Sequence, residues 1–267
     1  MMKPFESFKF NKAFGQNFIS DKNLLNAIAK DSGISFNDNV LEIGTGAGTL
    51  TEVLAQHAKK VVTFEIDKKL TEYLTEKFES IDNVQLVLKD ALTTPINEIE
   101  DLFLGQDFHL VANLPYYITT PLIFKFLEET DKAKSITVMV QKEVAEKIVA
   151  KCGDKNYGIT SVLFQYYFQP KIRRIVSKKM FSPPPKVDSA VIFMPRKQDV
   201  PFDKEFSDFV RACFAMKRKT LLNNLLKSGV EKSKISACLE EIGIELSVRA
   251  ENLPFDTIRL LYEKLNK

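Results

Sequence analysis

The sequence is poor in the residues from which metal sites and disulfide frameworks are built. It has two histidines, His57 and His109, and three cysteines, none of which forms a CxxC pair. Zinc sites need clustered Cys and His ligands, and an odd number of scattered cysteines does not make a disulfide framework. We therefore expect no metal cofactor, no disulfide framework and no histidine-based nucleophilic triad.

Long hydrophobic runs are also missing. No stretch approaches the roughly 18 uncharged apolar residues of a membrane-spanning helix, and the first ten residues lack the apolar segment of a secretory signal. The composition is 45% hydrophobic and 27% charged, which is typical of ordinary soluble globular proteins. We expect a cytoplasmic protein without a membrane partner.

Acidic residues are few in the C-terminal third of the chain. Residues 171–267 carry 20 Lys and Arg against 12 Asp and Glu, a net charge of +8, whereas residues 1–170 carry 18 against 23, a net charge of −5. This segment suits a polyanionic partner such as RNA, although a solvated charged surface has the same composition. Lys217, Arg218 and Lys219 precede an apolar helical pattern, where positive charge opposes the helix dipole. We interpret these three residues as candidate contacts for RNA phosphates.

Short apolar runs alternate with helical patterns through the first half of the chain. Strands buried on both faces have this pattern, and strands that alternate with helices form a parallel, doubly wound sheet. Two further β-rich runs, at 163–176 and 187–194, flank a proline-rich loop and predict an antiparallel hairpin that closes the sheet. The predicted parallel strands are residues 40–43, 61–66, 84–88, 108–112 and 136–140.

The pattern changes after residues 195–198, which we interpret as a linker. Beyond it, apolar residues recur every three or four positions, as in Phe206, Phe209, Val210 and Cys213, and this spacing predicts helices throughout. We expect two domains: an α/β domain at 1–197 and a small all-helical domain at 198–267.

A glycine-rich turn follows the first predicted strand. Gly44, Gly46 and Gly48 form a GxGxG pattern, and Glu42 stands two residues before it. The dinucleotide fingerprint is GxGxxG, and its third glycine is replaced here by Thr49. An acid at the turn suits a positively charged adenosyl amino acid better than a pyrophosphate. A purely structural loop is the alternative interpretation.

Polar side chains follow the next three predicted strands. Glu65 ends the second strand, where a carboxylate can accept both hydroxyls of a ribose, and Asp90 follows the third, where it can accept from an adenine amine. Capping of a helix is the alternative role of such acids. Asn113 ends the fourth strand and begins the sequence Asn-Leu-Pro-Tyr. Its acceptor oxygen and the ring of Tyr116 suit a planar substrate with an exocyclic NH₂, whereas a simple turn is the alternative.

These motifs together resemble the S-adenosylmethionine-dependent rRNA adenine dimethyltransferases, in order from about residue 12 to 194. The matching segments are 16–19, 42–48, 64–67, 90–91, 113–116 and 181–189. The resemblance implies a Rossmann-like class I methyltransferase fold, with a seven-stranded sheet and a helical C-terminal domain. It is closer to the KsgA/RsmA type, which acts on small-subunit rRNA, than to the Erm type, which acts on large-subunit rRNA and confers macrolide resistance.

The resemblance also implies a role for individual residues. Asn113 and the Leu114 carbonyl would accept hydrogen bonds from the target amine, and Tyr116 and Phe181 would stack on the target base. Phe14 and Phe18 are expected in core or lid packing. The residues that would contact S-adenosylmethionine are Asn17, Ile19, Gly44, Gly46, Glu65, Asp90 and Asn113.

The implied activity is dimethylation of two adjacent adenosines in a 16S rRNA hairpin near the 3′ end, coupled to assembly of the small ribosomal subunit. The implied enzyme is a monomer that binds rRNA within a pre-ribosomal particle. A non-catalytic RNA-binding assembly or transcription factor on the same fold is an alternative. A DNA amino-methyltransferase shares the Asn-x-Pro-Tyr chemistry, but the sequence has no resemblance to a DNA-reading domain.

Overall fold

The computed structural model describes residues 18–266, which form two compact units. One unit contains the chain through Ala145 together with Lys171–Arg196, and the other contains Glu146–Pro170 and the residues from Lys197 onward. The predicted division at residue 197 therefore needs a correction, because the segment Glu146–Pro170 groups with the C-terminal helices. Hydrogen bonds from the Tyr157 hydroxyl to the Leu253 carbonyl and from the Tyr167 hydroxyl to the Asp203 carbonyl hold it there.

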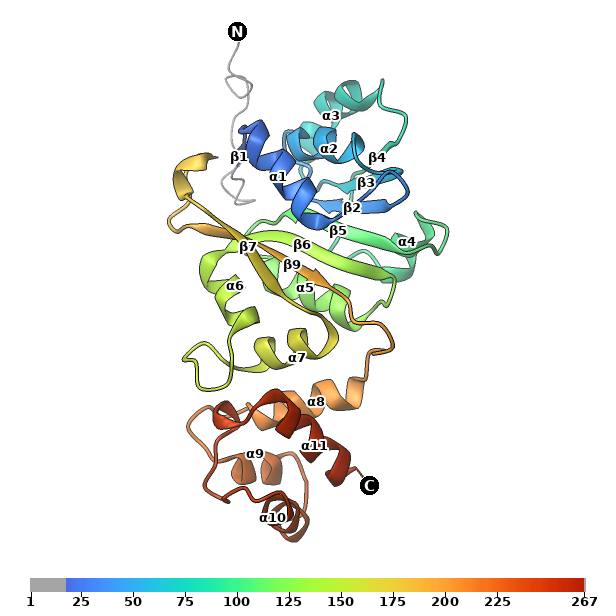
Figure 1. Ribbon diagram of the computed structural model, residues 1–267. Helices are drawn as coiled ribbons and strands as arrows, with labels where there is room; N and C mark the ends of the chain where they lie inside the picture. The colour runs from blue at the N-terminus through green and yellow to red at the C-terminus, as the bar shows by residue number, and fades with distance from the viewer. Residues whose placement is uncertain (1–17, 267) are drawn as a thin grey trace. The chain divides into compact units, whose positions relative to one another are not determined.

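The first unit is built on a seven-stranded sheet with the order β4-β3-β2-β5-β6-β9-β7 (Figure 1). The first five strands in this order run parallel, whereas β9 is antiparallel to both β6 and β7. The doubly wound sheet with an antiparallel edge is thus confirmed. The strands are β2 (Asn39–Ile43), β3 (Lys60–Phe64), β4 (Val84–Val87), β5 (Phe108–Asn113), β6 (Ala133–Gln141), β7 (Lys171–Val176) and β9 (Ser189–Pro195).

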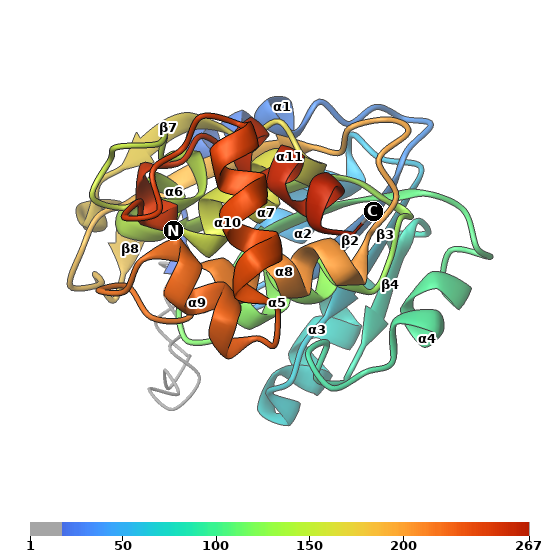
Figure 2. The ribbon, with the colours of Figure 1, turned by 90° about the horizontal axis from the view of Figure 1, so that it is seen from below.

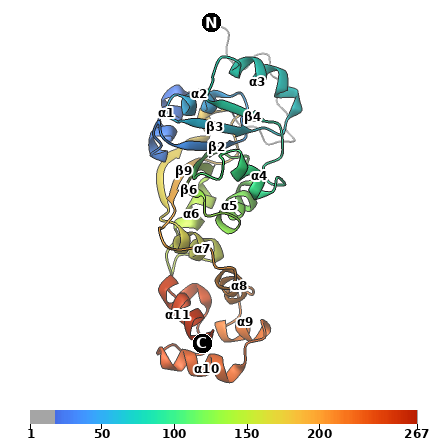
Figure 3. The same ribbon diagram turned by 90° about the vertical axis from the view of Figure 1, so that its right-hand side faces the viewer.

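Helices cover both faces of this sheet. In Figure 3, α1 (Lys22–Ser32) and α2 (Thr49–Ala55) lie on one side, and α4 (Ile96–Asp101) and α5 (Thr119–Glu128) lie on the other. Asp21 caps the N-terminus of α1, because its carboxylate oxygen accepts from the Leu24 N–H at 3.0 Å. The helix α3 (Thr71–Phe78) follows the 3₁₀ turn η2 (Lys68–Leu70). With both faces covered, the central strands are almost wholly buried.

The predicted β-rich run at 163–176 is only partly a strand. Its first five residues belong to α7 (Ile159–Tyr167), and β7 begins at Lys171. The helix is apolar on nearly all sides, and sequence periodicity cannot separate such a segment from a buried strand. The proline-rich loop contains the 3₁₀ turn η3 (Lys178–Met180) and β8 (Phe181–Ser182), which pairs antiparallel with β1 (Phe18–Ile19).

The second unit is helical, as predicted for the C-terminal region. Its helices pack around a core in which Phe206, Val210, Leu239 and Ile258 are fully buried. Figure 2 draws the C-terminal helices of this unit in orange and red. Besides α7 it contains α8 (Lys204–Cys213), α9 (Leu221–Lys227), α10 (Lys232–Glu241), the 3₁₀ turn η4 (Ala250–Asn252) and α11 (Phe255–Leu265), while α6 (Lys142–Val149) begins in the first unit and ends in the second.

No helix within residues 18–266 is long and apolar enough to span a bilayer.

Candidate active site

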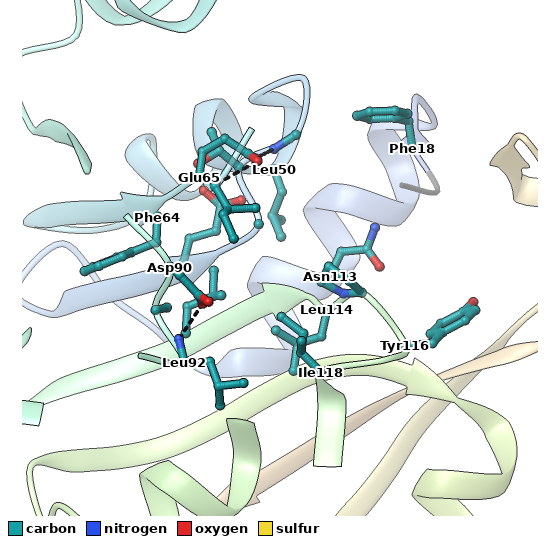
Figure 4. A pocket seen from close by; sticks show the side chains of 18 of the residues that line it. Phe18, Leu50, Phe64, Glu65, Asp90, Leu92, Asn113, Leu114, Tyr116 and Ile118 are labelled. Carbon is teal, nitrogen blue, oxygen red and sulfur yellow. Dashed lines mark hydrogen bonds between the residues drawn. The ribbon is translucent and has the colours of Figure 1, made fainter. Parts of the chain in front are cut away.

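A cavity of about 560 Å³ lies at the carboxyl ends of β2, β3, β4 and β5. Ligands of doubly wound folds bind at this edge, because loops from several strands converge there. Figure 4 shows Glu65 and Asp90 along one side of the cavity and Asn113, Leu114 and Tyr116 along another. The cavity brings together these predicted site residues: Ile19, Gly44, Gly46, Glu65, Asp90, Asn113, Leu114 and Tyr116.

The glycine turn between β2 and α2 forms one wall of the cavity. Gly44, Gly46 and Gly48 have φ angles of +84°, +56° and +72°, in the region that favours glycine. A side chain on Gly46 would also lie 3.0 Å from the Phe18 ring. The turn therefore exposes backbone to the cavity, where a ligand can approach closely.

Glycine is required at position 48 both by its positive φ angle and by the side chains that pack against it. A Cβ at Gly48 would lie 2.7 Å from Phe78 Cζ, whereas a Cβ at Gly33, which has a φ of +70°, meets nothing within 4 Å. Gly33→Ala should therefore cost about 1–2 kcal/mol of unfolding free energy from backbone strain alone. Gly48→Ala should cost about 1–3 kcal/mol more, because Phe78 must shift. Urea unfolding measures both, and equal losses would contradict the packing argument.

The Glu65 carboxylate is held at the end of β3 by three backbone donors. Its Oε2 accepts from the Gly46 N–H at 2.8 Å, and its Oε1 accepts from the N–H groups of Ile66 at 3.0 Å and Asp67 at 2.9 Å. Burial raises the pKa of Glu65, and the three N–H donors oppose that shift. A carboxylate has about four acceptor positions, so Glu65 retains capacity for a ligand while it ties the glycine turn to β3.

Asp90 follows β4 and lies beside Glu65 in Figure 4. Its Oδ1 accepts from the Leu92 N–H at 2.9 Å, so the side chain stabilises the turn that follows it. This turn is not the helix that the capping alternative assumed, because α4 begins only at Ile96. Tyr117 lines the same cavity and is 56% exposed. Burial and the charges of Asp90 and Glu65 raise the pKa of the Tyr117 phenol. Sequence reasoning missed Tyr117, although the second Tyr of the run Pro115-Tyr116-Tyr117 was a signal for it.

The segment Asn113–Tyr116 leaves β5 and forms the opposite wall. The Leu114 N–H donates to the Met139 carbonyl at 3.3 Å, which anchors the segment to β6. The Pro115 carbonyl accepts from the Ile118 N–H, whereas among the residues that the structure describes no hydrogen-bond donor reaches the Leu114 carbonyl. The Tyr116 hydroxyl lies 2.7 Å from Ser189 Oγ, which fixes the ring at the cavity edge.

The model of the family described as ribosomal RNA adenine dimethylase matches residues 7–267 of this sequence. The chain belongs to this family. A protein of Bacillus cytotoxicus named ribosomal RNA small subunit methyltransferase A is 42% identical over 97% of this chain and 92% of its own length. A protein of the same name in Bacillus mycoides is also 42% identical, over 97% of this chain and 92% of its own length.

Two solved structures resemble this family member over nearly its whole length. A dimethyladenosine transferase from Plasmodium falciparum has a TM-score of 0.80 and 28% identity, covering 93% of this chain and 97% of that chain. The 23S rRNA methyltransferase ErmE has a TM-score of 0.73 and 26% identity, covering 94% of this chain and all of that one. The Rossmann-like methyltransferase fold with a helical C-terminal region is therefore shown.

Glu42 borders the cavity, but its carboxyl group forms hydrogen bonds with buried threonine hydroxyls behind the cavity wall. Glu42 Oε2 accepts from the hydroxyls of Thr51 at 2.5 Å and Thr63 at 2.7 Å, and Thr63 Oγ1 lies 2.7 Å from Thr45 Oγ1. Burial raises the pKa of Glu42 to about 8, against the two hydroxyl donors. The network supports the glycine turn from beneath.

This pKa predicts a pH dependence of stability. The folded state holds a proton on Glu42 up to about pH 8, whereas the unfolded chain releases it near 4.5, so stability falls as pH rises between these values. Compared with Glu42→Gln, the wild-type protein should lose about 1 kcal/mol per pH unit between about pH 5 and pH 7. Urea unfolding of both proteins across this range measures the difference. Parallel stability curves would contradict a protonated Glu42.

Of the aromatic residues predicted near the site, Phe181 does not lie where the resemblance implies, whereas Phe18 does. Phe181 is 5% exposed and packs in the hydrophobic core with Ile19 and Leu25, and it is not among the described residues that line the cavity. Pairing of β8 with β1 places it there. Phe18, expected in core or lid packing, is buried and also lines the cavity over Gly46. The structure therefore does not bring Phe181 together with Tyr116 at the cavity.

The remaining predicted residues lie elsewhere. Asn17 and Phe14 are outside the described residues. Lys217, Arg218 and Lys219 are exposed in the second unit, in the loop between α8 and α9. Within residues 18–266, no cluster of three or more His, Cys, Asp and Glu side chains is arranged to hold a metal ion.

Proposed function

We propose that this protein transfers methyl groups from S-adenosylmethionine to the exocyclic amine of adenines in small-subunit rRNA. The observation that carries this proposal is the joint placement of Glu65, Asp90 and the Asn113–Tyr116 segment around one cavity. The Bacillus relatives, which are named as small-subunit rRNA methyltransferases, support the same substrate.

The cavity fits S-adenosylmethionine in size and in the chemistry of its walls. Its volume of about 560 Å³ lies within the ~300–1,000 Å³ of small-ligand sites. Glu65 would accept hydrogen bonds from the ribose hydroxyls and Asp90 from the adenine amine. The glycine turn at Gly44 and Gly46 would pack closely against the amino-acid end, with Ile19 beside it and Asn17 in the same role. The cofactor supplies an electrophilic methyl group on a positively charged sulfur.

The Asn113–Tyr116 segment would hold the target adenine. Asn113 and the Leu114 carbonyl would accept hydrogen bonds from the two N–H groups of the amine, which orients its lone pair toward the methyl group. The N–C bond would form as the S–C bond breaks, and the methylated amine would then release a proton to solvent. Tyr116 would stack on the base, which must leave its helix to enter the cavity.

We propose that two such transfers occur on each of two adjacent adenosines of a 16S rRNA hairpin near the 3′ end. After the first transfer only one N–H remains on the amine, so one of the two acceptors suffices for the second. We further propose that the protein acts as a monomer in the cytoplasm on a pre-ribosomal particle, and that its second unit binds rRNA through Lys217, Arg218 and Lys219. Folded rRNA would be recognised there mainly through its shape and phosphates.

Transfer of a radioactive methyl group tests the proposal. Small-subunit particles and large-subunit rRNA, both from cells that lack the gene, should be incubated with the protein and labelled S-adenosylmethionine, and the methylated adenines mapped. Label in two adjacent adenosines of the small-subunit rRNA is the expected result. Label confined to large-subunit rRNA would support the Erm-type alternative, and binding to particles without label would support a non-catalytic assembly factor.

A further inference from the structure

The second unit contains a cavity of its own, formed only by residues of the segments 146–170 and 197–266. Its volume is about 290 Å³, and it shares no lining residue with the cavity around Glu65. Two aromatic rings, Tyr157 and Phe214, line it in an edge-to-face arrangement with centroids 6.1 Å apart. Four cationic residues also line it: Lys147, Lys217, Lys219 and Arg249.

A hydrogen-bonded loop presents the cationic residues of this cavity. Asn224, which is 3% exposed, donates to the Cys213 carbonyl at 2.8 Å and accepts from the Met216 N–H at 3.1 Å. The Lys219 N–H donates to the Met216 carbonyl at 3.0 Å. The loop between α8 and α9 is therefore fixed at its base, and its lysine positions are set by the fold.

The three consecutive basic residues of this loop are not equivalent. Lys217 and Lys219 line the cavity, whereas Arg218 between them does not, although all three are exposed. A surface that only attracts phosphates has no need for this alternation. The arrangement instead points to a ligand that enters the cavity between Lys217 and Lys219.

The chemistry of the walls selects the ligand. Aromatic rings stack on nucleobases and cations bind phosphates, and single-stranded nucleic acids are bound by this combination. The Tyr157 hydroxyl donates to the Leu253 carbonyl at 3.0 Å, which fixes the ring. Glu251, which also lines the cavity, can accept from a base amine, because its only described ion pair is a long one of 3.9 Å with Arg249. A duplex keeps its bases stacked and cannot place one there.

We propose that this cavity binds one unpaired nucleotide of the RNA substrate, with the base against Phe214 and Tyr157 and the flanking phosphates on Lys217 and Lys219. The proposal rests on the proposed function, because it takes RNA as the substrate. It adds a second site of nucleotide recognition, in the other unit from the methyl-transfer cavity.

Binding experiments with the full-length protein test this site. The probes are a short single-stranded oligoribonucleotide and a blunt, fully paired RNA duplex of two strands with the same number of phosphates. The variants are Lys217→Gln with Lys219→Gln, and separately Phe214→Leu. The matched control is Lys227→Gln with Lys232→Gln, which removes the same charge from exposed positions of the second unit that line neither cavity.

The variants should affect the two probes differently. Loss of Lys217 and Lys219 should flatten the dependence of log K on log salt for the single strand by about 1.4, at roughly 0.7 per phosphate contact. Phe214→Leu should weaken single-strand binding roughly 5- to 150-fold, the effect of losing one stacked base, and leave duplex binding unchanged. The control pair should change neither value by a comparable amount.

Crosslinking RNA to the wild-type protein tests the site without any substitution that could disturb folding. Irradiation of an oligoribonucleotide that contains 4-thiouridine should give a peptide adduct at Tyr157 or Phe214 by mass spectrometry. Adducts confined to other residues, or equal losses in the lysine pair and its control, would overturn the proposal. Equal competition by polyglutamate and the oligonucleotide would also overturn it, since the cavity would then bind charge alone.

The proposed function can fail separately from this inference. If the wild-type protein methylates small-subunit particles but its lysine pair and control pair bind single strands alike, only the nucleotide site is wrong. If the wild-type protein transfers no methyl group to any rRNA, the proposed function is wrong whatever the binding results are.

Discussion

Asn113→Ala should lower methyl transfer by about 10²–10³, the scale for losing one oriented hydrogen-bonding group in an active site. Asn113 ends β5 beside Met139 of β6 and lines the cavity next to Leu114. Without its oxygen, the amine keeps only the Leu114 carbonyl as an acceptor, so its lone pair is poorly oriented. Affinity for S-adenosylmethionine should stay within about tenfold of wild type, because Glu65 and Asp90 are unchanged. Single-turnover transfer and calorimetric titration measure the two quantities.

Two further variants separate this role from general damage to the fold. Asn113→Asp keeps an acceptor oxygen and should retain more transfer than Asn113→Ala. Asn39→Ala is the control: Asn39 is a buried asparagine at the first residue of β2, whereas Asn113 is the last residue of β5. The Asn39 Nδ2 donates to the Asp107 carbonyl at 3.2 Å. This control variant should reduce stability without a comparable loss of transfer per folded molecule. Full transfer by Asn113→Ala would show that the amine is held by other groups.

Glu65→Ala should weaken binding of S-adenosylmethionine by about 2–3 kcal/mol, or roughly 30- to 150-fold. Part of the loss comes from the ribose hydroxyls, which lose a charged acceptor. The rest comes from the protein, because the N–H groups of Gly46, Ile66 and Asp67 all lose their partner. The glycine turn is then no longer tied to β3, and the wall that approaches the cofactor loosens.

Calorimetric titration of matched variants distinguishes these contributions. Glu65→Gln keeps the shape and one acceptor oxygen, so its loss of affinity should be smaller than that of Glu65→Ala. Asp67→Asn removes a neighbouring buried charge that is not among the described lining residues, and it should leave the affinity near that of wild type. Unchanged affinity in Glu65→Ala, with the variant still folded, would remove Glu65 from the ribose site.

Much of the site was determined by local sequence. The run at residues 40–43 can form a buried strand because three of its four side chains are apolar. The fourth, Glu42, accepts hydrogen bonds from buried threonine hydroxyls. Strand and helix alternate, so the strands must be parallel and their carboxyl ends must meet at one edge. For that reason Glu65, Asp90 and Asn113, which are far apart in sequence, could be predicted to share one cavity.

Two features of the fold depend on long-range contacts that the local sequence pattern does not specify. Residues 163–167 are apolar enough for either a strand or a helix, and the helix is selected by long-range contacts such as those of the Gln165 amide with the Ile148 and Ala150 carbonyls. Phe181 became a core residue because β8 pairs with β1, a contact between segments more than 160 residues apart.

The second unit shows the same division between sequence and structure. The amino-acid sequence alone shows that Lys217, Arg218 and Lys219 are basic and close to the start of a helix. Which of them lines a cavity depends on Asn224, Tyr157 and Arg249, which approach the loop only when the helices pack. Local patterns determine the chemistry that a segment offers, because they depend on neighbours along the chain. Shared cavities depend on neighbours in space, and those are decided by packing of the whole unit.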